Sequence, residues 1–408
     1  MRILFVADGR SPTALSWMQH WMERGHEVHL VSTFPCNSPA GLASFQVMPV
    51  AFAGWARGRK DRETKTSRQR GWMSQVRGPL QALRYFLGPL SLSLPRKRFR
   101  TLVADLRPDL VHALRIPFEG MLAVATPPEI PLLVSIWGND LTLHARGSSW
   151  MAAETRRVLR RADGLLADTA RDIRLGQEWG FEPGRPTSVL PGGGGIRLDE
   201  FESSSQVVEF PEELPDRPIV VNPRGQRPGS LRQDVFFQSI PLVLEKIPEA
   251  LFICPMLAGD AEAERWVDRL GIRSNTRLWP RLEAIRLRAL FRRGQVYVSP
   301  SVHDGTPNSL LEAMACGCFP VVGEVESLRE WLRPGVNGLL VDATSPRSMA
   351  DGIIEALEAP TLRQTARKEN TRVIAERADY GRCMAMAEVF YRKILEYRGK
   401  LPQREAMS

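Results

Sequence analysis

One pattern limits the folds open to this 408-residue chain more than any other: short apolar runs alternate with longer amphipathic ones along most of its length. At the start, RILFVAD predicts a buried strand, ALSWMQHWMERG predicts an amphipathic helix that stops at Gly25, and HEVHLVS predicts the next strand. Such strand–helix–strand alternation is typical of a mostly parallel sheet with helices on both faces. We therefore predict an α/β fold of the doubly wound type.

The alternation pauses once, between Pro191 and Pro218. Four consecutive glycines are followed there by polar sequence rich in Ser and Pro, which predicts a connection without a stable element. The pattern restarts at PIVVNPRG, so we predict two domains whose sheets have their carboxyl ends at a shared ligand-binding cleft. The predicted parts are a first domain at 1–197, a linker at 198–217, a second domain at 218–378, and a C-terminal helix within 379–408 for which packing back on the first domain is left open.

The net charge of +9 is concentrated in one segment of the predicted first domain. An insertion at 55–100 carries thirteen Lys and Arg against two acids, and apolar residues such as Trp72, Phe86 and Leu90 are interspersed with them. Cations combined with apolar anchors suit an anionic membrane surface. The alternative is a solvated loop followed by a helix that packs its apolar side on its own domain. We predict no nucleic-acid partner, because the segment has no finger, helix-turn-helix or RNA-binding signature.

Two further absences in the sequence bear on location and metals. The chain has no run of 18 apolar residues and its start lacks a signal-peptide pattern, so we expect a cytoplasmic protein, peripheral on the inner face of the membrane if 55–100 binds lipid. The five cysteines are scattered, and the C-x-C pair at Cys316 and Cys318 is interpreted as buried thiols rather than a zinc site. We predict no metal.

A polar loop, SVHDGTPN, follows the predicted strand QVYVSPS and precedes a helix that we expect to begin near Ser309. The free N–H groups of a helix start attract anions, and Gly305 and Pro307 suit a tight approach to a ligand. A diphosphate or sugar hydroxyls would fit there. The alternative is that Asn308 and Ser309 act only as helix N-caps.

A second loop, NPRGQRPGSLRQD, leaves the first strand of the predicted second domain with three arginines. Arg224, just past the strand, and Arg232, at the next helix start, are best placed to bind phosphates through their guanidinium forks. A solvated basic loop is the alternative. Neither loop matches G-x-x-x-x-G-K-[ST], so the sequence does not support a P-loop nucleotide site.

These motifs carry a family resemblance. The D-x7-E spacing of Asp304 and Glu312, within PSVHDGTPNSLLEAMACGCFPVV and before GVNGLLVD, resembles the E-x7-E signature of the family 4 glycosyltransferases. Weaker similarity lies in DGRSPTALSWMQHWMERGHEVHLVS, PDLVHAL, LLVSIWGNDL and VLPGGGGIRLDEF. The resemblance implies a retaining enzyme of the GT-B fold, with two Rossmann-like domains facing across a cleft.

The resemblance also implies roles for particular residues. A nucleotide-sugar would be held mainly by the second domain and a glycan or lipid-linked acceptor mainly by the first. Arg224 and Arg232 match the basic pair that binds the diphosphate leaving group, Glu312 matches the acid that binds the ribose hydroxyls, and Asp304 matches the acid near the sugar ring. No cofactor is implied, since the nucleotide-sugar is a substrate. The remaining implied residues for binding the nucleotide-sugar are Gly9, Gly305, Thr306, Pro307, Asn308, Ser309 and Leu310.

The chain departs from the family pattern at three positions. Asp304 stands where relatives usually have Glu, Arg232 replaces a lysine, and Trp137 in WGND stands where many relatives have His. Trp137 and Asp140 are assigned to the acceptor side. The alternative for Asp140 is that it only caps the following turn. Two other functions stay open: a nucleotide-sugar isomerase or phosphorylase of the same architecture, and a nucleotide-sugar-binding protein without transfer activity.

Overall fold

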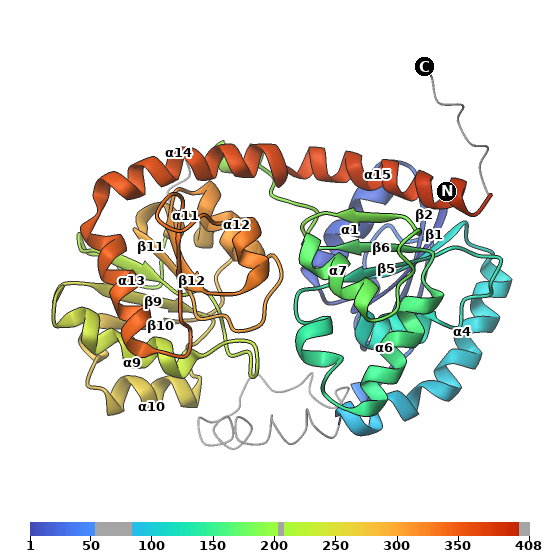
Figure 1. Ribbon diagram of the computed structural model, residues 1–408, viewed down its shortest axis with the longest axis horizontal. Coiled ribbons are helices and arrows are strands. Elements are labelled where there is room, and N and C mark those ends of the chain that lie inside the picture. The colour runs from blue at the N-terminus through green and yellow to red at the C-terminus, as the bar shows by residue number, and fades with distance from the viewer. Residues whose placement is uncertain (54–83, 203–207, 400–408) are drawn as a thin grey trace. The chain divides into compact units, whose positions relative to one another are not determined.

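The computed structural model describes residues 1–53, 84–202 and 208–399 (Figure 1). The chain divides into two compact units. The first contains the described residues up to Gly195 together with those after Tyr380, and the second runs from Ile196 to Tyr380. Most of the basic insertion predicted at 55–100 lies outside the described residues, which resume at Arg84.

The first unit is built on a seven-stranded parallel sheet in the order β3-β2-β1-β4-β5-β6-β7, with helices on both faces (Figure 1). Its strands are β1 (Arg2–Ala7), β2 (Glu27–Ser32), β3 (Ser44–Val47), β4 (Leu110–Ala113), β5 (Leu132–Ile136), β6 (Gly164–Ala167) and β7 (Thr187–Val189). Its helices are α1 (Pro12–Glu23), α4 (Ser93–Leu106), α5 (Met121–Ala123), α6 (Ser149–Arg161), α7 (Ala170–Glu178) and α15 (Tyr380–Tyr397), with short turns η2 (Pro89–Leu92), η3 (Ile116–Gly120) and η4 (Asp140–His144).

The second unit has a six-stranded parallel sheet in the order β10-β9-β8-β11-β12-β13. Its strands are β8 (Ile219–Val221), β9 (Leu251–Pro255), β10 (Thr276–Trp279), β11 (Val296–Ser299), β12 (Phe319–Gly323) and β13 (Leu339–Val341). Its helices are α8 (Asp199–Glu202), α9 (Gln233–Leu244), α10 (Ala261–Arg269), α11 (Ala284–Arg293), α12 (Asn308–Ala315), α13 (Pro346–Glu358) and α14 (Pro360–Arg377), with short turns η5 (Arg273–Asn275) and η6 (Glu326–Glu330).

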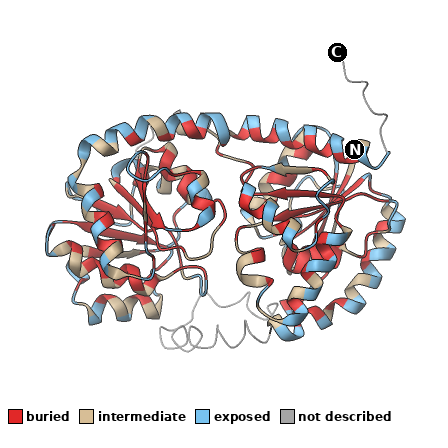
Figure 2. Cartoon of the chain, viewed as in Figure 1, coloured by how far each residue is buried: buried red, intermediate tan, exposed pale blue. Residues whose placement is uncertain are grey.

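The central strands of both sheets are buried and mostly apolar, as expected of parallel strands covered on two sides. All four residues of β4 and all five of β9 are buried, and Figure 2 shows buried strands in each unit beneath helices that are buried on one side only. In α1, the Ser11 side chain caps the first turn, and Trp17 and Trp21 face the core. These features confirm the predicted α/β fold with two doubly wound sheets.

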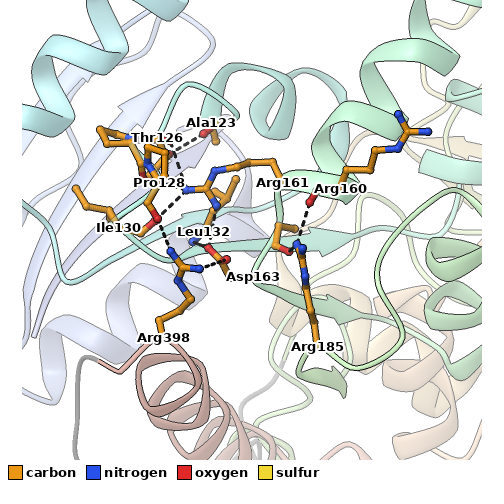
Figure 3. Close-up of polar contacts among 12 residues, drawn as sticks. Ala123, Thr126, Pro128, Ile130, Leu132, Arg160, Arg161, Asp163, Arg185 and Arg398 are labelled. Carbon is orange, nitrogen blue, oxygen red and sulfur yellow. Dashed lines mark hydrogen bonds and ion pairs between the residues drawn. The ribbon is translucent and has the colours of Figure 1, made fainter.

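Helix α15 packs on the first unit through polar as well as apolar contacts. Tyr391 stacks on Trp21 with ring centroids 4.1 Å apart, and its hydroxyl hydrogen-bonds Nδ1 of the buried His112 in β4. Near the helix end, Arg398 lies 3.4 Å from one carboxylate oxygen of Asp163, and Arg161 donates a 2.9 Å hydrogen bond to the other oxygen (Figure 3). The segment after Tyr380 is therefore fixed to the first unit at both its middle and its end.

Two elements differ from the sequence-based prediction. Helix α8 forms inside the stretch from Pro191 to Pro218, which we predicted to lack stable elements. Its Phe201 packs against the core of the second unit and lies 5.0 Å beneath the Arg288 guanidinium, a tertiary contact that local sequence cannot reveal. The pattern of VESLREWLRPG, at 325–335, predicts a helix followed by a turn, but the helical part forms only the short η6. Within the described ranges, no helix combines the length and apolar character that crossing a bilayer requires.

Candidate functional site

The motifs of the second unit meet at the carboxyl ends of β8 and β11. These strands are neighbours at the centre of the sheet, where the strand order changes direction, which is the usual ligand position in open parallel sheets. The loop after β8 and the loop after β11 are also joined along their backbones. Arg232 N–H donates to the Pro300 carbonyl at 2.9 Å, and Val302 N–H donates to the Ser230 carbonyl at 2.9 Å. The two loops that the sequence singled out are therefore adjacent.

Arg224 is the cation at the centre of this site. Its side chain is only 6% exposed, and it forms an ion pair of 2.6 Å with Asp304 and a weaker hydrogen bond of 3.4 Å with Ser309 Oγ. Burial is the largest single influence and lowers the pKa of Arg224, but Asp304 and Tyr297 together raise that pKa above its ordinary value. Its Nε has no hydrogen-bonding partner among the residues that the structure describes. Arg224 thus remains a cation with one N–H still to be satisfied.

Asp304 is held from several sides. Ser301 Oγ donates to the same carboxylate oxygen as Arg224, at 2.9 Å, and Gly305 N–H donates to the other at 3.2 Å. Ser327 Oγ donates to the Asp304 carbonyl at 2.7 Å. The Asp304 carboxylate is therefore held in place by the loop after β11 and by Arg224.

The remaining loop residues surround the start of α12, which begins at Asn308 with Pro307 in the cap position. Thr306 accepts a 2.9 Å hydrogen bond from the Trp331 indole, and Ser309 Oγ lies 3.1 Å from the Tyr297 hydroxyl. Leu310 is completely buried in the core, so only its main chain can serve a ligand at the loop.

Glu312 lies in the second turn of α12. Burial raises its pKa to about 7, against a lowering by Arg288. Arg288 itself forms a 2.8 Å ion pair with Glu200 of α8. The Glu312 carboxyl therefore exchanges its proton near neutral pH.

Arg232 is placed differently from Arg224. Its guanidinium makes two hydrogen bonds to Asp234, of 2.9 and 2.7 Å, and its side chain is 39% exposed. This pairing raises the pKa of Arg232. The structure thus places one buried and one accessible arginine on the joined loops.

Of the two residues assigned to the acceptor side in the first unit, Trp137 lines a cavity, whereas Asp140 is fully buried. Asp140 is 0% exposed and accepts hydrogen bonds from Arg115 at 2.7 Å, Ile116 N–H at 3.0 Å and Trp137 N–H at 3.2 Å. Asp140 therefore orients its neighbours rather than presenting a free carboxylate. The Arg115 guanidinium lies 5.7 Å from the Trp137 ring centroid.

Gly9, the remaining residue predicted to bind the nucleotide-sugar, follows β1 in the first unit. A Cβ atom there would come within 2.7 Å of Cys36 Sγ and 3.0 Å of Ser32 Oγ. Its N–H donates to Ser32 Oγ at 3.1 Å. Close packing thus accounts for a glycine at this position.

Sequence reasoning missed several residues of these sites. Ser301 and Tyr297 support Asp304 and Ser309, and Arg115 and Glu119 lie beside Trp137 in the first unit. Arg115 follows the end of β4 by two residues, so the rule that selected Arg224 would also have selected it. Within the described part of the chain, no three His, Cys, Asp or Glu residues cluster as a metal site would require.

Comparison with known proteins assigns both halves of the chain. Residues 8–193 match a family model described as glycosyl transferase 4-like domain, and residues 226–359 match one described as glycosyl transferases group 1. The chain is 26% identical over 215 residues to the D-inositol 3-phosphate glycosyltransferase of Thermobifida fusca, covering 50% of this chain and 49% of that protein. It is 24% identical over 197 residues to the phosphatidyl-myo-inositol mannosyltransferase of Mycobacterium tuberculosis, covering 47% and 50%. The matched region spans about half the length of these curated relatives.

Solved structures share the fold across the whole chain. Sucrose-phosphate synthase from Thermosynechococcus elongatus superposes with a TM-score of 0.70 at 14% identity, covering 97% of this chain and 100% of that one. HepE of Anabaena in complex with UDP superposes with a TM-score of 0.67 at 14% identity, covering 96% and 100%. Because the two family models account for most of its length and the fold agrees, the chain belongs to the family 4 type of glycosyltransferases.

Proposed function

We propose that this protein is a retaining glycosyltransferase that moves a sugar from a nucleotide-sugar to a hydroxyl of a glycan or lipid-linked acceptor. The second unit would hold the nucleotide-sugar and the first unit the acceptor. One observation carries the proposal: the buried Arg224 of the loop after β8 contacts two half-buried residues, Asp304 of the loop after β11 and Ser309 in the first turn of α12. Solved relatives of this fold were obtained with UDP and with UDP-glucose, which supports a nucleotide-sugar.

The chemistry of transfer suits this network. The bond between the sugar's anomeric carbon and the diphosphate breaks with its electron pair passing to the diphosphate, while the acceptor oxygen bonds that carbon and gives its proton to an oxygen of the departing diphosphate. Negative charge therefore grows on the diphosphate in the transition state, where preorganised cations and helix N–H groups stabilise it most. We assign this role to Arg224, Arg232 and the amides from Gly305 to Ser309, without a metal or other cofactor.

The two acids have separate proposed roles. Asp304, fixed beside Arg224, would bind a hydroxyl of the transferred sugar, and Glu312 would accept hydrogen bonds from the ribose hydroxyls. A carboxylate with two oxygens matches two neighbouring hydroxyl donors. Because Asp304 is one methylene shorter than the usual Glu, we expect Asp304→Glu to change the preferred sugar rather than abolish binding.

A thermal-shift screen tests this proposal. UDP-, GDP-, ADP- and dTDP-sugars are each added to the full chain in the presence of EDTA. At least one should stabilise it, by roughly 2.7 kcal/mol at a concentration one hundred times the dissociation constant. Arg224→Met should remove the shift, whereas Arg273→Met, at an exposed ion pair of the same unit, should keep it. No stabilisation by any of these compounds would overturn the proposal.

We also propose that the protein is cytoplasmic and that its first unit contacts the anionic inner face of the membrane. Phe86, Leu90 and Leu94 recur every four residues and are each more than half exposed. Exposed cations at Lys97, Arg98 and Arg100 follow in α4. Apolar side chains beside cations favour the interface of an anionic leaflet, such as the cytoplasmic one.

Vesicle co-sedimentation tests the membrane contact. The full chain should bind vesicles containing phosphatidylglycerol at 0.1 M salt and bind several-fold less at 0.5 M salt. Leu90→Ser combined with Leu94→Ser should also weaken binding several-fold, whereas Val389→Ser, at an exposed apolar residue of α15, should not. Equal binding by the double variant would show that this surface does not face the membrane.

A further inference from the structure

Helix α11 carries a mostly buried cation, Arg288, beside the helix that holds Glu312. Helices α11 and α12 lie side by side in the second unit (Figure 1). The Cys316 thiol, one turn after Glu312, donates to the Arg288 carbonyl at 3.5 Å. Only 12% of the Arg288 side chain is exposed, and its Nε is buried without a hydrogen-bonding partner among the described residues. Arg288 can therefore take a further acceptor.

The Arg288 guanidinium is held in place by helix α8. One of its nitrogens forms a 2.8 Å ion pair with Glu200, and its central carbon lies 5.0 Å from the Phe201 ring centroid. Arg292, one turn further along α11, donates a 2.6 Å hydrogen bond to the Phe201 carbonyl. A guanidinium that pairs with an acid and stacks on an aromatic ring keeps a defined position. Helix α8 thus determines where the Arg288 charge lies.

Arg288 and Glu200 act on Glu312 in opposite directions. Burial is the largest influence and raises the pKa of Glu312 to about 7, whereas the Arg288 cation lowers that pKa and the Glu200 carboxylate raises it. One guanidinium is therefore shared by two acids. Arg288 favours the carboxylate form of Glu312, and Glu200 opposes it.

Other charged or titratable groups surround α12 as well: Cys316 just after its end, Arg292 of α11, Arg367 of α14, and the paired Arg224 and Asp304 near its start. The Cys316 thiol stays protonated, because burial raises its pKa to about 12. The arginines keep their charge at any pH of interest, and Asp304 is held by one of them. Between pH 6 and 8, Glu312 is therefore the group of this set that changes its charge.

We propose that Arg288 is a positioning residue of the nucleotide site, which holds the Glu312 carboxylate for the ribose hydroxyls while Glu200 and Phe201 of α8 hold Arg288. The inference rests on the proposed function, because that function gives the ribose to Glu312. It adds a residue that acts through Glu312 without touching the nucleotide. It also gives α8, within the stretch from Pro191 to Pro218, an influence on nucleotide affinity.

Calorimetry with nucleoside diphosphates tests the role of Arg288. The probes are whichever of UDP, GDP and ADP binds the full chain most tightly and its 2′,3′-dideoxy analogue, which lacks the ribose hydroxyls. Arg288→Met should weaken binding of the ribose form roughly fivefold at pH 7 but less than twofold at pH 9, because Glu312 then loses its proton about one pH unit higher. The dideoxy analogue should bind both proteins equally. Arg286→Met, at an exposed arginine of the same helix, is the matched control and should change neither affinity.

Glu200→Gln tests the opposing acid. This variant should bind the ribose form at least twofold more tightly than the wild type at pH 6 and equally at pH 8, because Glu312 loses the neighbour that raises its pKa. Arg288→Lys keeps the cation and should retain most of the wild-type pH profile. If Arg288→Met does not fold, Glu200→Gln still decides the question, because Glu200 is 45% exposed. Unchanged binding by both variants overturns the inference, and so does an equal loss for the ribose and dideoxy forms at every pH.

Titration of Glu312 without nucleotide separates the inference from the proposed function. Carbon-13 NMR follows the side-chain carboxyls of the full chain, and Glu312→Gln identifies the signal of Glu312. That signal should titrate at higher pH in Arg288→Met and at lower pH in Glu200→Gln than in the wild type. Identical titrations overturn the inference even where nucleotides bind, and the proposed function then stands. If none of the three nucleotides binds, the proposed function falls, and the titration alone decides whether Arg288 and Glu200 set the charge of Glu312.

Discussion

Glu312 connects the proposed site to pH. Its pKa is about 7 because burial disfavours the carboxylate, whereas ribose hydroxyls would donate to the carboxylate and favour it. Binding of a nucleoside diphosphate below pH 7 should therefore release a proton. Affinity should rise about fivefold between pH 6 and 7 and then level off, because the deprotonated fraction of Glu312 rises by that factor.

Calorimetric titrations from pH 5.5 to 8, in two buffers of different ionisation enthalpy, measure this proton release. Glu312→Gln should bind more weakly at pH 8 and lose the extra pH dependence. The nucleotide's own phosphate also titrates near pH 6, but it does so in both proteins and cancels in the comparison. Identical pH profiles for the two proteins would remove Glu312 from contact with the nucleotide.

Arg224 and Arg232 should differ in stability although both are assigned to the diphosphate. The Arg224–Asp304 pair is buried, so Arg224→Met should cost about 3 to 5 kcal/mol of unfolding free energy because Asp304 is left unpaired. Arg232→Met should cost less than about 1 kcal/mol, because its pair with Asp234 is about one third exposed. Urea unfolding of the two variants measures the difference, and Asp304→Asn added to Arg224→Met should restore part of the loss. Equal losses for the two single variants would contradict this description.

At the residue scale, the spacing and chemistry of the sequence are enough to predict part of the candidate site in the second unit. The position of Arg224 just past a predicted strand indicates a phosphate-binding role, the D-x7-E spacing and the family resemblance indicate Asp304, and the structure brings the two within 2.6 Å. Their pairing could not be foreseen, because it depends on β8 and β11 being neighbours in the sheet. The burial of Asp140 likewise depends on Arg115, a residue 25 positions earlier in the chain.

At the scale of elements, α15 depends on a hydrogen bond to the sheet. His112 is fully buried and burial lowers its pKa to about 3, so the ring stays neutral at physiological pH. Tyr391→Phe would leave Nδ1 of His112 without its hydrogen-bonding partner, the tyrosine hydroxyl. The substitution should lower the free energy of unfolding by about 1 to 3 kcal/mol. Tyr397→Phe, at an exposed tyrosine of the same helix, should have no measurable effect in thermal unfolding. Equal melting temperatures for Tyr391→Phe and the wild type would contradict this role.

Strands were easier to predict than short helices. Fully buried runs such as β5 and β9 contain few or no polar side chains, so local sequence is sufficient to identify them. Helix α8 has four residues and is supported by Phe201 beneath Arg288, more than 80 residues further along the chain. Isolated helices of that length are not stable, so only the tertiary contact explains α8.

At the scale of the whole molecule, the repeated alternation was enough to predict two doubly wound units. The packing of α15 on the first unit could not be predicted from this alternation, because the residues that determine it are far apart in the sequence. Glu388 pairs with Arg24 at 2.8 Å, and Arg398 pairs with Asp163 at 3.4 Å. These ion pairs link α15 to segments hundreds of positions earlier and assign it to the first unit.

The stereochemistry of transfer tests the central claim most directly. The full chain is incubated in EDTA with the nucleotide α-sugar that stabilises it most and with a panel of glycan and lipid-linked acceptors. Proton NMR then follows the anomeric signal of the product. The account predicts release of a nucleoside diphosphate together with an α-linked product, and loss of both in Arg224→Met. A β-linked product, or no release of nucleoside diphosphate, would contradict it.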